Sequence, residues 1–215
     1  MNETREKKLR LGVLISGGGR TLLNLHELIQ RGELPCEVAV VVASRDCKGI
    51  ERARSAGLEV FSVPYKSFRR KDGPADIAGY SAAIAERLDA AETGLVLQAG
   101  FLSLWRVPPQ YEGKVMNIHP ALLPSFGGSG MYGHHVHEAV LAAGCKVSGC
   151  TVHFVTNEYD RGPIIVQRAV PVEEGDDADT LAARVFKQEC IAYPEAIRLF
   201  AAGRLHIGDS VVRIT

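Results

Sequence analysis

The chain has 215 residues, of which 46% are hydrophobic and 23% charged, enough apolar material for the core of one compact domain. Its 25 basic and 25 acidic side chains balance, so no overall field favours nucleic acid or an anionic membrane as a partner. No apolar run approaches the roughly 18 residues that a membrane span needs. We therefore expect a single domain over residues 1–215, with residues 1–10 as a polar arm.

The cysteines indicate a reducing compartment. They are dispersed, odd in number and contain no Cys-x-x-Cys pair, which fits free thiols better than a disulfide framework. The charged start of the chain also lacks the apolar stretch of a secretory signal. We expect a soluble, cytoplasmic protein.

The first half of the chain alternates between strands and helices. Five segments are expected in the order strand, helix, strand, helix, strand: 11–15, 22–29, 37–43, 49–56 and 58–63. This alternation predicts a parallel sheet joined by right-handed crossovers. A polar, breaker-rich exposed loop follows at 65–75, and then a helix at 76–91.

A glycine turn, Ser16-Gly17-Gly18-Gly19-Arg20-Thr21, lies between the first strand and the first helix. Such a turn aims free backbone N–H groups and a helix dipole at an anion. It matches neither a complete G-x-G-x-x-G, because Leu22 takes the last glycine position, nor a P-loop. The pattern favours one phosphate or phosphoribosyl group over a dinucleotide, although a tight turn without a ligand would look the same.

In the second half of the chain, the regular alternation of strands and helices ends after the central strand. Strands are expected at 95–99, 115–118, 147–155 and 164–172, a helix at 134–143, a long helix at 180–200, and a short strand or tail at 204–215. Strands 147–155 and 164–172 read as an antiparallel pair. The whole predicts an α/β, Rossmann-like fold: a mostly parallel twisted sheet with flanking helices and an antiparallel C-terminal part.

Strong hydrogen-bonding side chains end the central strand. Asn117 and His119 are two residues apart, so they point to the same side, and Pro120 cannot continue the ladder. An amide beside an imidazole suits stabilising and protonating an oxyanion. A capping Asn and a structural His would give the same pattern. Asp160, in the turn between the antiparallel strands, favours the catalytic interpretation because a carboxylate can orient and charge an imidazole.

Two further stretches are each compatible with a structural role or with a ligand-binding role. The exit of the fourth strand, residues 100–105, is unusually apolar, and it could be core or the wall of a slot for a flat aromatic ligand. His134, His135 and His137 begin a helix, but no carboxylate or cysteine completes a recognisable metal-ligand spacing. We expect no metal.

Together these stretches resemble the folate-dependent phosphoribosylglycinamide formyltransferase family. The matching motifs are Ile15-Ser16-Gly17-x-Gly19, Gln98-Ala99-Gly100-Phe101, Asn117-Ile118-His119-Pro120, Val152-His153-Phe154-Val155, Asp160-x-Gly162-Pro163 and Gln188-Glu189 through Tyr193-Pro194. They span about residues 10–207. The resemblance implies formyl transfer from the co-substrate 10-formyltetrahydrofolate to the amine of 5′-phosphoribosylglycinamide in de novo purine biosynthesis. It implies small-molecule substrates, no metal, and a monomer or homodimer.

The resemblance assigns catalysis to Asn117, His119 and Asp160. Asn117 and a protonated His119 would donate hydrogen bonds to the oxyanion of a tetrahedral intermediate, and Asp160 would favour the charged imidazole. Activity would then fall as the pH rises through the pKa of His119. It would also fall on the acid side once Asp160 or the attacking amine is protonated, which gives a bell-shaped profile.

Binding roles follow from the same resemblance. The ribonucleotide would contact Gly19, Arg20 and Thr21 at its phosphate and Glu189 at its sugar. The folate would contact Leu102, Ser103, Leu104, Trp105, Asn117, Thr156 and Asp160. The family usually has a small polar pair at Arg20-Thr21 and an arginine at Ser103.

Two alternatives remain. Another formyltransferase would act on an amino sugar or on methionyl-tRNA, although the tRNA enzymes normally carry a second, basic domain. A non-catalytic nucleotide-binding module would use only the glycine turn, and the presence of Asn117, His119 and Asp160 argues against it.

Overall fold

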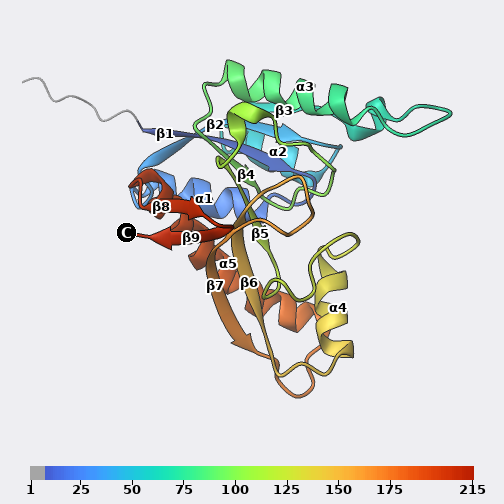
Figure 1. Ribbon diagram of the computed structural model, residues 1–215, viewed down its shortest axis with the longest axis vertical. Helices are drawn as coiled ribbons and strands as arrows, with labels where there is room; N and C mark the ends of the chain where they lie inside the picture. Colours follow the sequence, from blue (N-terminus) through green and yellow to red (C-terminus); the bar gives the residue numbers. More distant parts are fainter. Residues whose placement is uncertain (1–7) are drawn as a thin grey trace, which may run out of the picture.

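A seven-stranded mixed sheet forms the centre of the computed structural model, which describes residues 8–215 (Figure 1). Its strand order is β3-β2-β1-β4-β5-β6-β7. The strands are β1 Leu9–Ile15, β2 Cys36–Ala43, β3 Val60–Ser62, β4 Leu95–Gln98, β5 Val115–His119, β6 Val147–Phe154 and β7 Ile164–Pro171. All pairs from β3 to β5 are parallel, whereas β6 pairs antiparallel with both β5 and β7. The predicted fold is confirmed; most of the predicted arm at 1–10 lies outside the described residues.

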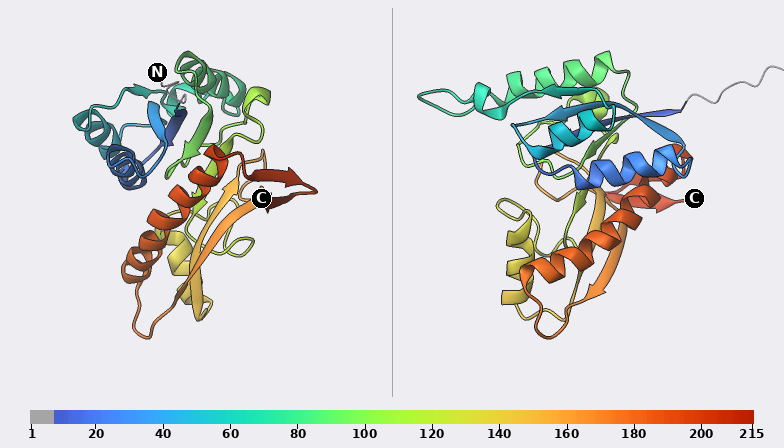
Figure 2. Two further views of the ribbon diagram at one scale, coloured as in Figure 1. Left: turned by 90° about the vertical axis from the view of Figure 1, so that its left-hand side faces the viewer. Right: turned by 180° about the vertical axis from the view of Figure 1, so that it is seen from behind.

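Helices cover both faces of the sheet (Figure 2). They are α1 Arg20–Gln30, α2 Lys48–Ser55, α3 Ile77–Ala90, α4 His134–Ala142 and α5 Ala178–Ala201. Apolar side chains of α1, α2 and α5 share one buried cluster, and those of α3 belong to a second cluster on the opposite face. Among residues 8–215, no helix combines the length and the apolarity that a bilayer span requires.

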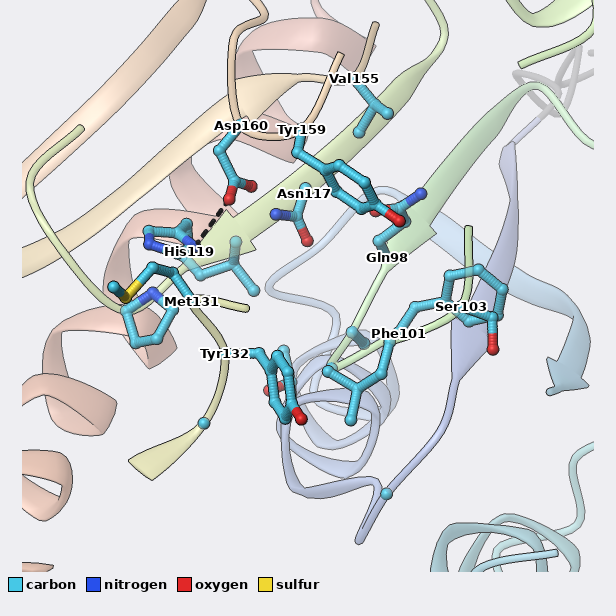
Figure 3. Close-up of a pocket in the computed structure, with 18 of the residues that line it drawn as sticks. Gln98, Phe101, Ser103, Asn117, His119, Met131, Tyr132, Val155, Tyr159 and Asp160 are labelled. Atoms are coloured by element: carbon cyan, nitrogen blue, oxygen red, sulfur yellow. Dashed lines mark ion pairs between the residues drawn. The ribbon is translucent and has the colours of Figure 1, made fainter. Parts of the chain in front are cut away.

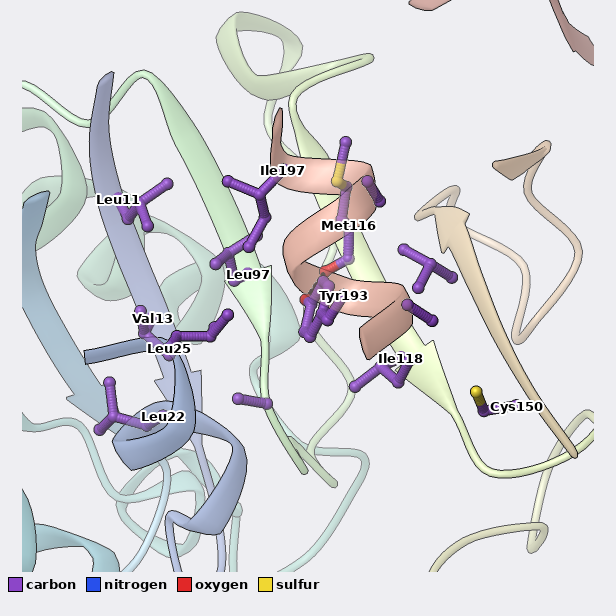
Figure 4. Packing of buried hydrophobic residues seen from close by; sticks show 14 of the residues in the cluster. Leu11, Val13, Leu22, Leu25, Leu97, Met116, Ile118, Cys150, Tyr193 and Ile197 are labelled. Atoms are coloured by element: carbon purple, nitrogen blue, oxygen red, sulfur yellow. Dashed lines mark hydrogen bonds between the residues drawn. The ribbon is translucent and has the colours of Figure 1, made fainter. Parts of the chain in front are cut away.

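Strand residues alternate between these two clusters. Leu11 and Val13 of β1 face α1 and α5, whereas Leu14 faces α3 (Figure 4). Because both faces are covered, the central strands are mostly apolar, as parallel strands usually are. In β4 and β5 the polar side chains, Gln98, Asn117 and His119, follow the apolar residues toward the carboxyl end.

Tyr193 of α5 connects this core to strands β4 and β5. Its ring is fully buried. Its hydroxyl donates to the carbonyl oxygens of Gln98, at 3.1 Å, and Met116, at 2.9 Å. The long helix is thereby fixed against β5 at the residue immediately before Asn117.

Two segments differ from the sequence-based expectation. The predicted loop at 65–75 begins with a 3-10 turn, η1 Tyr65–Phe68, whose two aromatic rings pack edge-on against Tyr80 of α3 at 5.0 and 5.4 Å. The predicted strand or tail at 204–215 is a hairpin of β8 Leu205–Gly208 and β9 Val211–Ile214. Its turn residues, Asp209 and Ser210, both have positive φ, the geometry that suits a two-residue hairpin.

Candidate functional site

A cavity of about 700 Å³ opens at the carboxyl ends of β1, β4 and β5. Ligands of open α/β sheets bind at this edge. All the residues that the sequence assigned to a site line this one cavity: Gly19, Arg20, Thr21, Leu102, Ser103, Leu104, Trp105, Asn117, His119, Thr156, Asp160 and Glu189. They come from segments that are up to 170 positions apart, so the fold has to bring them together.

The glycine turn is packed tightly against the start of α2. Gly19 has a φ of 71°, in the left-handed region that favours glycine. A Cβ on Gly19 would lie only 3.1 Å from the Cα of Gly49. In return, the N–H of Gly49 donates to the carbonyl oxygen of Gly17 at 3.0 Å. This close approach fixes the path of the turn.

Two arginines bind carbonyl oxygens of the same turn. Arg45 donates to Ser16 at 2.6 Å, and Arg52 donates to Gly18 at 2.7 Å. Since these contacts engage carbonyl groups, they leave the N–H groups of the first turn of α1 available to an anion. The N-cap residue of α1, Gly19, provides no side-chain hydrogen bond that would compete.

Asn117 contacts a histidine on the neighbouring strand. Its side-chain nitrogen lies 3.2 Å from Nε2 of His153, its partner residue in the β5–β6 register. Nδ1 of His153 lies 2.8 Å from the carbonyl oxygen of Phe154, so Nδ1 carries the proton and Nε2 accepts from the amide. One N–H of Asn117 is therefore occupied, and its second remains for a ligand. His153 could not be recognised as a site residue from the sequence, because only the strand register pairs it with Asn117.

His119 is almost completely buried, with 4% of its side chain exposed. Its Nε2 lies 2.8 Å from the carbonyl oxygen of Phe126, so that nitrogen is protonated. Its Nδ1 lies 3.7 Å from a carboxylate oxygen of Asp160 (Figure 3). Burial lowers the pKa of His119 below its usual 6.5, and the opposing effect of Asp160 does not compensate. At neutral pH the ring is thus neutral, with a free lone pair on Nδ1.

Asp160 is held by the loop that follows β5. It has a φ of 52°, and one of its carboxylate oxygens accepts the backbone N–H of Gly128 at 2.9 Å. Its other oxygen lies 3.7 Å from His153. Burial opposes ionisation of this carboxyl, but His153, the Gly128 amide and His119 outweigh it, and the pKa of Asp160 is lowered. The 3.7 Å separation from His119 is longer than a direct hydrogen bond and suits an ion pair once the ring is charged.

The apolar stretch after β4, residues 100–105, contributes both to the core and to the cavity wall. Leu102 is 42% exposed and lines the cavity, whereas Trp105 is 3% exposed and packs toward Tyr111 in the core. Tyr132, from the segment before α4, lies across from Phe101 (Figure 3). These side chains form part of the wall of the cavity.

The histidines at the start of α4 belong partly to this cavity. His137 is 4% exposed and lines it, and burial lowers its pKa to about 4. His134 lies 3.5 Å from Asp179 of α5. Within residues 8–215, no group of three histidine, cysteine, aspartate or glutamate side chains is arranged to hold a metal ion.

Comparison with known proteins identifies relatives of the chain. The Formyl transferase family matches residues 9–197. The crystal structure of glycinamide ribonucleotide transformylase 1 from Symbiobacterium toebii is 41% identical, with a TM-score of 0.86, and the match covers 99% of each chain. That of phosphoribosylglycinamide formyltransferase from Brucella melitensis is 38% identical, with a TM-score of 0.80, and covers 94% of this chain and 100% of the other.

Two longer relatives contain a similar region. The chloroplastic phosphoribosylglycinamide formyltransferase of Vigna unguiculata is 38% identical over 204 residues, which are 93% of this chain and 63% of that protein. The trifunctional purine biosynthetic protein adenosine-3 of Bos taurus is 37% identical over 207 residues, or 95% of this chain and 19% of that protein. The chain therefore spans less than two thirds of either relative.

Proposed function

This chain belongs to the formyl transferase family, and on that premise we propose that it transfers the formyl group of 10-formyltetrahydrofolate to the amine of 5′-phosphoribosylglycinamide, a step of de novo purine biosynthesis. One observation carries the proposal: the Asn117, His119 and Asp160 group and an anion-binding glycine turn open into the same cavity. Both substrates are small molecules, and the reaction needs no metal.

The ribonucleotide binds with its phosphate at the glycine turn. Gly19, Arg20 and Thr21 begin α1, where backbone N–H groups and the helix dipole attract an anion. Glu189 of α5 lines the same end of the cavity, and burial raises its pKa to about 7. A carboxyl with this pKa can either accept from or donate to the hydroxyl groups of a ribose.

The folate occupies the opposite end. Its flat ring system fits the slot formed by Leu102, Ser103 and Leu104 in front of Trp105, and it reaches Thr156 and Asp160 on the other side. The formyl group then lies near Asn117, between the two binding regions. This placement brings the amine and the formyl carbon together, which by itself supplies much of the rate enhancement in two-substrate reactions.

Attack by the amine forms a carbon–nitrogen bond and puts negative charge on the formyl oxygen. The free N–H of Asn117 donates to that oxygen. Nδ1 of His119 accepts a proton of the attacking amine, directly or through water, and later returns it to the folate nitrogen as the carbon–nitrogen bond to the folate breaks. Asp160 stabilises the imidazolium in between. The protonated His119 implied by the resemblance thus arises during the reaction.

The assay that tests this function measures transfer from 10-formyltetrahydrofolate to 5′-phosphoribosylglycinamide. Turnover is expected with the wild type, and Asn117→Ala should lower kcat about 10²- to 10³-fold, the usual cost of one oxyanion donor. His119→Ala should also lower kcat strongly. His135→Ala is the matched control, because His135 is exposed on α4 and lies outside the cavity wall.

Other outcomes identify the alternatives. Formylation of an amino sugar or of methionyl-tRNA, without reaction of the ribonucleotide, would replace the proposed acceptor. Ribonucleotide binding without any transfer would identify a binding module. A cytoplasmic location and a monomeric or dimeric state remain predictions, and the Vigna unguiculata relative is named as chloroplastic.

A further inference from the structure

Arg20 is the one lysine or arginine among the described residues that line the cavity. Its side chain forms no ion pair within 4.0 Å of a carboxylate in the range 8–215. The positive charge at this end of the cavity is therefore not neutralised by a direct partner. A charge in this position is suited to an anionic part of a ligand.

Phe186 of α5 also lines the cavity, and its ring packs against the Arg20 guanidinium. The central carbon of the Arg20 guanidinium lies 4.4 Å from the centroid of the Phe186 ring, a cation–π contact between α1 and α5. Stacking uses the face of the guanidinium and leaves the N–H groups on its edge free to bind two oxygens of a phosphate. Phe186 has no donor of its own, so its contribution to an anion site can come only through Arg20.

We propose that Phe186 is a positioning residue that holds Arg20 ready for the phosphate of the ribonucleotide, and that Arg20 is the side chain that distinguishes the phosphorylated substrate from its nucleoside. The identity of the ligand rests on the proposed function; the pairing of the two side chains does not. An unrestrained arginine loses side-chain conformational entropy when a ligand immobilises it. Stacking on Phe186 before binding removes part of that loss.

The test is a double-mutant cycle with steady-state kinetics. Arg20→Gln should raise KM for the ribonucleotide about 10- to 100-fold, the range for a lost hydrogen bond to a charged group, with little effect on KM for the folate. Phe186→Leu should raise the same KM about two- to fivefold, as expected for an exposed cation–π contact. Phe186→Tyr keeps a ring face and should restore the wild-type value. In the Arg20→Gln background, Phe186→Leu should have no further effect.

The nucleoside that lacks the phosphate separates recognition from general damage. Its kcat/KM should be the same in the wild type, Arg20→Gln and Phe186→Leu, because neither side chain would have a phosphate to bind. Arg31→Gln is the matched control for lost charge: Arg31 is exposed at the other end of α1, paired with Glu33. It should leave every parameter unchanged.

Several results would overturn the proposal. Additive effects of Arg20→Gln and Phe186→Leu on KM would show that the two residues act independently. Equal losses with the nucleoside would show that they support the fold and not the phosphate. If the wild type does not formylate the ribonucleotide, the proposed function fails. The pairing of Arg20 and Phe186 is then tested by calorimetric titration with inorganic phosphate, using the same single and double variants. Weaker phosphate binding in both single variants, with no further loss in the double variant, would still support the pairing of the two side chains.

Discussion

Two opposing effects on one ring decide the protonation of His119. Burial disfavours the imidazolium, and Asp160, 3.7 Å away, favours it; burial is the larger effect. A neutral ring with Nδ1 unprotonated is suited to accept the proton that an attacking amine must lose. The expectation that activity falls as the pH rises through the pKa of His119 is therefore reversed: kcat/KM should rise with pH through that pKa.

Asp160→Asn tests this assignment. It removes the charge that raises the pKa of His119, so the pKa should fall further below 6.5 and the acid limb of kcat/KM should move to lower pH. The rate on the plateau should also fall, because the imidazolium loses its partner. NMR titration of the His119 ring proton measures the shift directly, and His135 serves as an internal reference. A titration midpoint that moves upward would contradict this account.

The glycine turn and the start of α2 pack closely against each other. Gly49 approaches so closely that a Cβ would lie 2.6 Å from the carbonyl oxygen of Gly17 and 2.9 Å from the Ile15 side chain. Real structures essentially never show such contacts, so the backbone would have to move. The backbone path of the glycine turn consequently depends on a residue about 30 positions later in the chain.

Gly49→Ala should therefore destabilise the protein by about 1–3 kcal/mol, the usual cost of overpacking a tight site. Gly17→Ala is the matched comparison, because a Cβ there meets nothing within 4 Å and the φ of Gly17 is not positive. It should change the free energy of unfolding by no more than about 0.5 kcal/mol. Urea unfolding of both variants measures the difference. Equal losses would show that the contact between the two elements is unimportant.

In the molecule as a whole, α5 helps to hold β4 and β5 together. Tyr193 shares its hydroxyl hydrogen between carbonyl oxygens of both strands, and the one on β5 belongs to the residue before Asn117. The same helix carries Phe186 and Glu189 to the ligand end of the cavity. A change at Tyr193 would therefore affect the core and the site together.

Tyr193→Phe should lower the free energy of unfolding by about 1–2 kcal/mol, since two buried carbonyl groups lose their shared donor. Tyr80→Phe provides the contrast: Tyr80 is also fully buried, but its hydroxyl makes no hydrogen bond within 3.5 Å among residues 8–215 and has only looser contacts with Ser44 and Ser103. Its removal should therefore cost less than removal of the Tyr193 hydroxyl, which forms two short hydrogen bonds. Thermal and urea unfolding compare the two variants, and a larger loss for Tyr80→Phe would refute the argument.

Local patterns in the sequence determined the succession of strands and helices and the glycine turn. They also placed Asn117 and His119 on one side of a strand, because two-residue periodicity and turn chemistry act over a few neighbouring residues. The early 3-10 turn and the final hairpin were not predicted, since aromatic packing and a two-residue turn replaced the expected loop and tail. The long helix α5, by contrast, was evident from its apolar spacing.

Only the tertiary structure decided the relations between distant residues. The register of β6 places His153 against Asn117, the Gly128 amide holds Asp160, and Phe186 lies beneath Arg20. The direction of the His119 pKa shift also required the fold, because it is the difference between a burial effect and a charge effect. Both depend on distances and solvent exposure, which are set by packing between segments far apart in the chain and by no local pattern of residues.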